Sequence, residues 1–180
     1  MPQALVTSKT RIKLLMKFFL NSRNTSYLRD LAAEYGESTN AIRVELNRME
    51  AAGLLEAKWQ DNKKIFRANK KHPLFDSIQQ LLFRHTGIDR IVDHVVSKLG
   101  GLHQAYLCGT FARGVDSPVI ELLLISNGIN QEYLQELTGK AEQMIDRQIR
   151  YRFTTPQEAD AVLKDCQEAL LLYDSSKEKE

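Results

Sequence analysis

The chain has 180 residues, 43% of them hydrophobic and 27% charged, a composition ordinary for a globular protein. No apolar run reaches the ~18 residues that a membrane span requires, so we expect a cytoplasmic protein with no membrane partner. The net charge of +2 hides an asymmetry, because residues 1–72 carry 14 Lys and Arg against 7 Asp and Glu, whereas the remainder carries 11 against 16. This division favours a basic domain, suited to nucleic acid, beside an acidic one.

The basic part of the chain shows the periodicity of three helices followed by a hairpin. The expected elements are a helix over 8–20, a short helix over 27–35, a helix over 39–52, and a β-hairpin over 54–67 with its tip at 61–63. Ser26 and Ser38 can cap the second and third helices, and Gly36 supplies the tight turn between them. This order of elements predicts a winged helix-turn-helix.

The rest of the chain alternates helices and strands, which predicts a second, α/β domain and an α+β fold class overall. A helix over 74–85, with Pro73 in its first turn, is expected to connect the two domains. The elements expected after it are a helix over 87–99, a strand over 102–108, a loop over 109–118, a strand over 119–125, a helix over 131–146, a strand over 148–153, a helix to 164 opened by a capping box at 155–158, and a strand over 169–173.

These elements divide the chain into four parts. They are a winged-helix domain over 1–72, a connecting helix over 73–86, an α/β domain over 87–174 and a disordered tail over 175–180. On the connecting helix, the residues predicted to share one apolar face are Leu74, Ile78, Leu81 and Leu82. We expect this helix to contact a second subunit. Cys108 and Cys166 lack the spacing of metal ligands, so we expect two buried thiols and neither a disulfide framework nor a metal site.

The third helix carries the candidate DNA-reading residues. Ile42, Leu46 and Met49 recur on one side, which directs the opposite side to solvent. Arg and Asn side chains hydrogen-bond guanine and adenine edges in the major groove. The candidate contacts to double-stranded DNA are therefore Thr39, Asn40, Arg43 and Asn47 for bases, with Arg48, Lys58, Lys63, Lys64 and Arg67 for the backbone or the adjacent minor groove; Lys9, Arg11 and Lys13 of the first helix are further candidates for phosphate.

The runs Tyr27–Ala32 and Ser38–Leu55 together resemble prokaryotic winged-helix repressors of the arsenic-repressor type. The resemblance covers about 60 residues and implies a DNA-binding transcriptional regulator. The chain lacks the cysteine pair that the metal sensors of that family carry near their recognition helices, so metal sensing is not implied.

The run Leu107–Gly114, followed by the apolar run Val119–Ile125, resembles the minimal nucleotidyltransferases of the DNA polymerase beta superfamily. In that family a Gly-Ser turn meets nucleotide phosphates, and an Asp-x-Asp pair on the next strand holds two magnesium ions. The residues that match the phosphate-binding part and the second carboxylate are Gly109, Thr110, Arg113 and Glu121, whereas Val119 stands at the first carboxylate. Arg150 and Arg152 occupy the later strand where a third carboxylate would be expected. The resemblance therefore implies a nucleotidyltransferase-like fold without transferase activity, with no catalytic residue and no bound metal.

Three hypotheses remain open. The first is a homodimeric DNA-binding regulator whose second domain senses a nucleotide effector or mediates dimerisation; no other cofactor is expected. The second is an active nucleotidyltransferase guided by its winged helix, in which Asp116 from the loop would join Glu121 in binding magnesium. The third takes both domains as protein-interaction modules.

Overall fold

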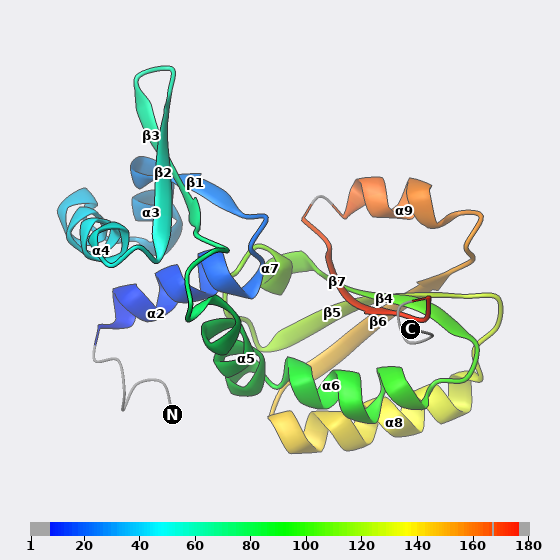
Figure 1. The fold of residues 1–180 in the computed structure, drawn as a ribbon. Coiled ribbons are helices and arrows are strands. Elements are labelled where there is room, and N and C mark those ends of the chain that lie inside the picture. Colours follow the sequence, from blue (N-terminus) through cyan, green and yellow to red (C-terminus); the bar gives the residue numbers. More distant parts are fainter. Residues whose placement is uncertain (1–7, 167, 177–180) are drawn as a thin grey trace. The chain divides into compact units, whose positions relative to one another are not determined.

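The computed structural model describes residues 8–166 and 168–176, which form an α+β protein (Figure 1). This confirms the predicted fold class. The chain divides into two compact units, Met1–Leu82 and Phe83–Glu180. The division falls within α5 (Phe75–Thr86), the helix predicted to connect the domains. None of the helices in the described ranges has the length and apolar character needed to cross a membrane.

The N-terminal unit has the predicted helix-turn-helix order. Its helices are α2 (Lys9–Leu15), the π-helical turn η1 (Met16–Leu20), α3 (Leu28–Tyr35) and α4 (Thr39–Ala51). The Ser38 hydroxyl accepts a hydrogen bond from the Ala41 backbone N–H at 3.1 Å, which confirms Ser38 as the cap of α4. Gly36 has a φ of 63°, a backbone conformation that ends α3 at little cost for glycine. The apolar side chains that close the core between these helices include Leu14, Phe18, Phe19, Leu31, Ile42 and Leu46.

A three-stranded antiparallel sheet completes this unit. Its strands are β1 (Thr25–Tyr27), β2 (Leu55–Gln60) and β3 (Lys63–Ala68), in the order β1-β3-β2. Ser26 was expected to cap α3, but it lies in β1 opposite Phe66 and leaves α3 without a side-chain cap. The hairpin turn consists of Asp61 and Asn62, both with positive φ, as a tight two-residue turn requires. Lys63 therefore belongs to the strand and not to the tip.

The C-terminal unit is a mixed four-stranded sheet with helices on both faces, which bears out the α/β prediction for this part of the chain. Its elements are α6 (Ile88–His94), the 3-10 turn η2 (Val96–Lys98), β4 (Leu102–Cys108), α7 (Gly109–Ala112), β5 (Val119–Ser126), α8 (Gln131–Ile145), β6 (Gln148–Thr154), α9 (Ala159–Asp165) and β7 (Leu170–Asp174). The strand order is β6-β5-β4-β7. Strands β5 and β6 are parallel and joined through α8, while the other pairs are antiparallel. In Figure 1, α6 and α8 lie on one side of this sheet and α9 on the other.

Several local expectations for this part of the chain were wrong. The single helix expected over 87–99 breaks at Val95 into α6 and η2. The expected loop over 109–118 begins with the one-turn helix α7. In the capping box, Thr155 Oγ1 does contact Glu158 Oε2 at 3.2 Å, but the pair closes a turn and α9 begins only at Ala159.

The apolar face expected on the connecting helix is covered only in part within the chain. Phe75 and Leu82 are buried, whereas Leu74 and Leu81 are 55% and 46% exposed. Ser175, in the predicted tail, donates its backbone N–H to the His103 carbonyl at 2.9 Å. The rest of that tail, over 177–180, lies outside the described residues, as do residues 1–7.

Candidate functional site

A groove of about 610 Å³ opens between the start of α3, the exposed side of α4 and the hairpin of β2 and β3. We call it the wing groove. The residues that line it are Tyr27, Leu28, Arg29, Asp30, Arg43, Asn47, Trp59, Asp61, Asn62, Lys63, Lys64 and Phe66. The groove therefore brings together side chains from α3, from α4 and from the hairpin that follows it.

The orientation of α4 follows the predicted period. Ile42, Leu46 and Met49 are buried in the core of the unit. Arg43 and Asn47, one turn apart on the exposed side, both line the wing groove. Thr39 and Asn40 are exposed in the first turn of the same helix and do not line it. The structure thus places all four candidate base-reading residues on the solvent side of α4.

Ion pairs distinguish the candidate backbone contacts from one another. Three of these basic side chains are engaged within the unit, in the pairs Arg48–Glu45 at 3.4 Å, Lys64–Glu50 at 2.6 Å and Arg67–Glu56 at 2.7 Å. Within residues 8–166 and 168–176, Arg43 and Lys58 make no ion pair or side-chain hydrogen bond. The Lys63 ammonium lies 5.8 Å from the centre of the Tyr27 ring. Among the candidates on α4 and the hairpin, Arg43, Lys58 and Lys63 are therefore those that form no ion pair with a carboxylate of the described residues.

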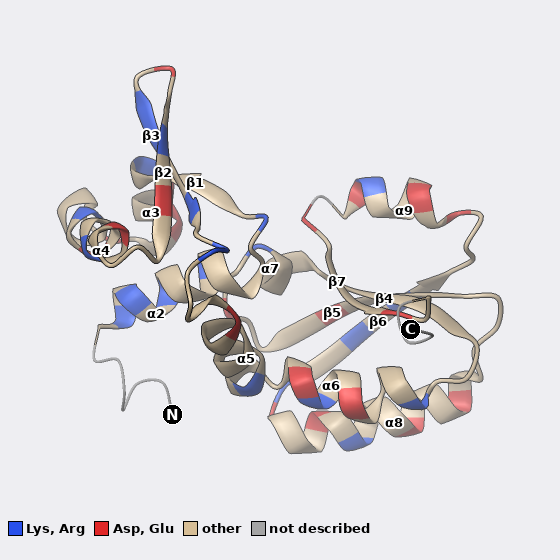
Figure 2. Ribbon diagram, in the orientation of Figure 1, with Lys and Arg blue, Asp and Glu red and all other residues tan. Residues whose placement is uncertain are grey.

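The register of the hairpin separates its two faces. Trp59 lies opposite Lys64 on the face that lines the wing groove, and Trp59 is 75% exposed. Lys58 and Arg67 belong to the other face, because side chains alternate along each strand. Figure 2 shows the basic residues of β3 in blue along the hairpin. The predicted wing contacts are thus divided between two faces.

Trp59 and Arg29 are two of the groove residues that the sequence did not indicate as part of a site. Trp59 was noted only as part of the strand pattern, although an aromatic residue on the solvent side of a short hairpin was an available signal. Arg29 follows Leu28 at the start of α3, and like Arg43 it makes no ion pair among the described residues. The sequence predicted the position of Arg29 in the short second helix, but it did not predict that Arg29 lies close to the hairpin.

The basic side chains of the first helix have an internal role. Arg11 Nε lies 2.8 Å from Glu45 Oε2, and Lys13 Nζ lies 2.7 Å from Glu37 Oε1. Burial by itself would raise the pKa of Glu45, but hydrogen bonds from Arg11 and Ser8 outweigh it and hold that pKa below its usual range. Two of the three residues suggested for phosphate contact from this helix therefore anchor α2 to the rest of the unit.

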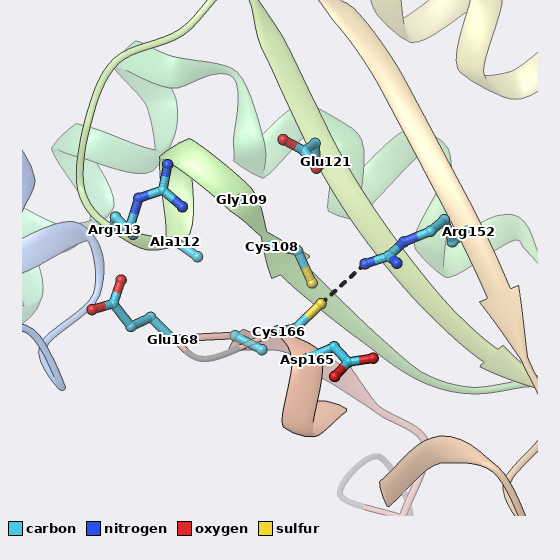
Figure 3. A pocket seen from close by; sticks show the side chains of 10 residues that line it. Cys108, Gly109, Ala112, Arg113, Glu121, Arg152, Asp165, Cys166 and Glu168 are labelled. Atoms are coloured by element: carbon cyan, nitrogen blue, oxygen red, sulfur yellow. Dashed lines mark hydrogen bonds between the residues drawn. The ribbon is translucent and has the colours of Figure 1, made fainter. Parts of the chain in front are cut away.

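The C-terminal unit contains a separate cavity of about 310 Å³ beside Gly109 (Figure 3). We call it the Gly109 pocket. The residues that line it are Cys108, Gly109, Ala112, Arg113, Glu121, Arg152, Asp165, Cys166, Glu168 and Ala169. Three of the four residues predicted for nucleotide binding are among them. Thr110 lies in α7 and does not line the pocket.

Glycine is favoured at position 109 by its backbone conformation and by its surroundings. The residue has a φ of 63°, and a Cβ atom there would lie 2.6 Å from Glu121 Cδ. Glu121 lies opposite Cys108 in the pairing of β4 with β5, which brings its carboxylate to this turn. Within the described residues Glu121 has no hydrogen-bond or ion-pair partner. The turn is therefore shaped to leave room for this carboxylate.

The carboxylates do not form the pair that magnesium-dependent transfer needs. Val119 stands two residues before Glu121 on β5, and Asp116 is held by Arg147 Nη1 at 2.7 Å without lining the Gly109 pocket. The pocket instead contains Asp165 and Glu168, which the sequence did not indicate. No group of three or more His, Cys, Asp or Glu in the described part of the chain is arranged to hold a metal ion.

The charge of the Gly109 pocket is mixed. Arg113 and Arg152 line the pocket together with three carboxylates, those of Glu121, Asp165 and Glu168. A polyphosphate would meet repulsion from these carboxylates as well as attraction from the guanidinium groups. The phosphate-binding role of Gly109 and Arg113 stays a prediction.

Comparison with known proteins gives only distant likenesses. No family model matches the chain, and no curated protein matches it. A candidate nucleotidyltransferase from Sulfolobus solfataricus is 21% identical, over 56% of this chain and 89% of that one, with a TM-score of 0.37. A mutant of the toxin–antitoxin pair MntA–HpeT is 16% identical, over 51% and 75%, with a TM-score of 0.39. A mutant of ZitR from Lactococcus lactis is 16% identical, over 51% and 68%, with a TM-score of 0.31.

Proposed function

We propose that this protein is a DNA-binding transcriptional regulator whose N-terminal unit reads double-stranded DNA through α4 and the hairpin of β2 and β3. One observation carries the proposal. The wing groove brings Arg43 and Asn47 of α4 to the same opening as Lys63 and Trp59 of the hairpin. A helix for the major groove with an adjacent basic hairpin is the docking surface that a winged helix-turn-helix uses.

The chemistry of α4 supports base reading. Arg43 is exposed and makes no ion pair among the described residues, so its guanidinium is available for the two acceptors of a guanine edge. Asn47 lies one turn further along and can donate to and accept from an adenine edge. Thr39 and Asn40 extend this surface to the first turn of α4.

The hairpin supports contact with the DNA backbone. Lys63 and Lys58 carry charges that no carboxylate of the described residues neutralises, which suits them to phosphate. Trp59 offers an exposed apolar surface to the sugars or to the floor of the minor groove. The Asp30 and Asp61 carboxylates also line the groove and repel phosphate at their own positions, so they restrict where the backbone can pass.

The regulator would act as a homodimer. Helix-turn-helix proteins occupy paired half-sites about 34 Å apart, which a two-fold assembly matches. Leu74 and Leu81 present exposed apolar surface in and beside α5, and a second copy would bury it. The C-terminal unit would then serve as a sensing or dimerisation module without transferase activity, a role favoured by Val119 at the first carboxylate position and by the pairing of Asp116 with Arg147.

The test compares two arginines of the same helix. Arg43→Ala should weaken binding to the preferred duplex by about 1–3 kcal/mol and relax base preference. Arg48→Ala, the matched control, removes a side chain that already pairs with Glu45, so it should lower the affinity for all sequences slightly and equally. Competition titrations of a labelled promoter duplex against base-substituted duplexes measure both effects. Equal effects of the two variants, or DNA binding without sequence preference, would contradict base reading by α4.

A further inference from the structure

Two cysteines that are about 60 residues apart in the sequence meet at the Gly109 pocket. Cys108 ends β4 and Cys166 follows α9, and both line the pocket. In Figure 3 the sulfur atoms of Cys108 and Cys166 point toward each other. Both are free thiols. The sequence predicts only two unrelated buried thiols, because nothing in their spacing indicates that β7 brings the chain back beside β4.

The two thiols differ in accessibility. Cys108 is only 3% exposed, whereas Cys166 is half-buried at the edge of the pocket. Burial, followed by the contact with Cys166, raises the pKa of Cys108 to about 12, so this group stays protonated. Arg152 Nη2 lies 3.2 Å from Cys166 Sγ and places a positive charge beside that sulfur. A sulfur that is accessible and faces a guanidinium group is the better nucleophile of the pair.

We propose that Cys108 and Cys166 form a reversible disulfide bond in response to hydrogen peroxide, joining the end of β4 to the end of α9 at the Gly109 pocket. The proposal is independent of DNA binding by the N-terminal unit. Because Gly109 directly follows Cys108, the bond fixes the backbone at the turn that shapes the pocket. It also converts the Cys166 thiol, whose sulfur accepts the hydrogen bond from Arg152, into a disulfide sulfur.

The chemistry takes two steps. The Cys166 sulfur attacks one oxygen of hydrogen peroxide, the O–O bond breaks, and Cys166 becomes a sulfenic acid as one water is released. The Cys108 sulfur then attacks the sulfenic sulfur, the S–O bond breaks, and the Cys108 proton leaves with the hydroxide as a second water. The two thiols lose two electrons in total, and one peroxide molecule is reduced. A dithiol reductant reverses the reaction through thiol–disulfide exchange.

Mass spectrometry of the peroxide-treated wild-type chain tests the proposal without any substitution. The expected product is a monomeric chain lighter by two hydrogen atoms, about 2 Da, with a peptide crosslink between Cys108 and Cys166 that dithiothreitol removes. Retention of both thiols at millimolar peroxide would overturn the proposal. A crosslink that joins two chains through Cys166 alone would overturn it as well.

Variants test the order of the steps and the role of Arg152. Cys108→Ser should stop at a Cys166 sulfenic acid that dimedone traps, whereas Cys166→Ser should leave Cys108 unreactive while the protein stays folded by circular dichroism. Arg152→Gln should slow disulfide formation several-fold. Arg150→Gln should not, because Arg150 lies on the same strand but makes no hydrogen bond to either sulfur within the described part of the chain and does not line the pocket. Modification of Cys108 in folded Cys166→Ser would contradict the assignment of Cys166 as the attacking thiol, and equal rates for the two arginine variants would contradict the role of Arg152.

Discussion

Replacing Arg11 with alanine should destabilise the N-terminal unit and change how its stability depends on pH. Arg11 donates to both carboxylate oxygens of Glu45, with Nε at 2.8 Å and Nη2 at 3.3 Å. The Glu45 side chain is only 9% exposed, while that of Arg11 is 36% exposed. A hydrogen bond to a charged group contributes about 1.5–3 kcal/mol, and the partial exposure of Arg11 favours the lower end. We therefore expect a loss of about 2 kcal/mol at pH 7.

The sign of the pH effect follows from the pKa of Glu45. In the wild type this pKa is lowered on folding, despite burial, because Arg11 and Ser8 stabilise the carboxylate. The stabilisation is complete above the unfolded-state pKa of about 4.3 and is lost as the pH falls through the lower folded-state pKa. Without Arg11, only Ser8 and Arg48 offset the effect of burial, so the folded-state pKa of Glu45 rises and the ionised carboxylate stabilises the fold less. The difference in unfolding free energy between wild type and variant should thus be small at about pH 3 and grow to about 2 kcal/mol at pH 7.

Urea unfolding at a series of pH values measures this difference. Trp59 is the sole tryptophan of the chain and reports on the N-terminal unit, and circular dichroism follows the whole protein. Lys140→Ala is the control, since the Lys140–Glu136 pair lies exposed on α8 and should contribute almost nothing. An Arg11→Ala cost no larger than that of the control, or a difference independent of pH, would refute the reasoning.

Two further predictions concern the turn at Gly109 and the tip of the hairpin. Gly109→Ala should lower the free energy of unfolding more than Gly101→Ala does. Both glycines have positive φ, so alanine costs about 1 kcal/mol at either position, but only position 109 is crowded by Glu121. In a Glu121→Ala background the difference between the two variants should vanish, and its persistence in chemical denaturation would exclude the proposed contact. Asp61→Asn keeps a residue type that tolerates the left-handed conformation of the turn and removes a carboxylate from the wing groove. The variant should therefore bind duplex DNA several-fold more tightly at low salt. An unchanged affinity would mean that DNA does not approach the tip of the hairpin.

The helix-turn-helix was predictable because its signals are local. The periodicity of α3 and α4, the turn at Gly36 and the cap at Ser38 each lie within a few residues of the feature they specify. The cap expected at Ser26 failed for the opposite reason, since pairing of β1 with β3 across about 40 residues outweighs a local capping preference. The same limit applies to Thr155–Glu158, which closes a turn that leads into α9 at Ala159 and does not itself form the first turn of the helix.

The candidate sites were predictable only in part. The exposed side of α4 followed from its period, but which basic residues remain unpaired depended on partners such as Glu45 and Glu50, which only the folded unit brings close. The meeting of Cys108 with Cys166 likewise depends on β7 pairing with β4 at the edge of the sheet. Sequence spacing carries no information about such contacts between distant segments.

The most direct test of the central proposal is a titration of labelled duplexes from the protein's own promoter, and of scrambled duplexes, at several salt concentrations. The account predicts selective binding to the promoter. It also predicts a loss of affinity of at least about 40-fold between roughly 50 and 200 mM salt, the slope expected for about three phosphate contacts such as those of Arg29, Lys58 and Lys63. Absence of binding at low salt, or binding that salt does not weaken, would contradict DNA recognition and would favour a protein-interaction role for the N-terminal unit.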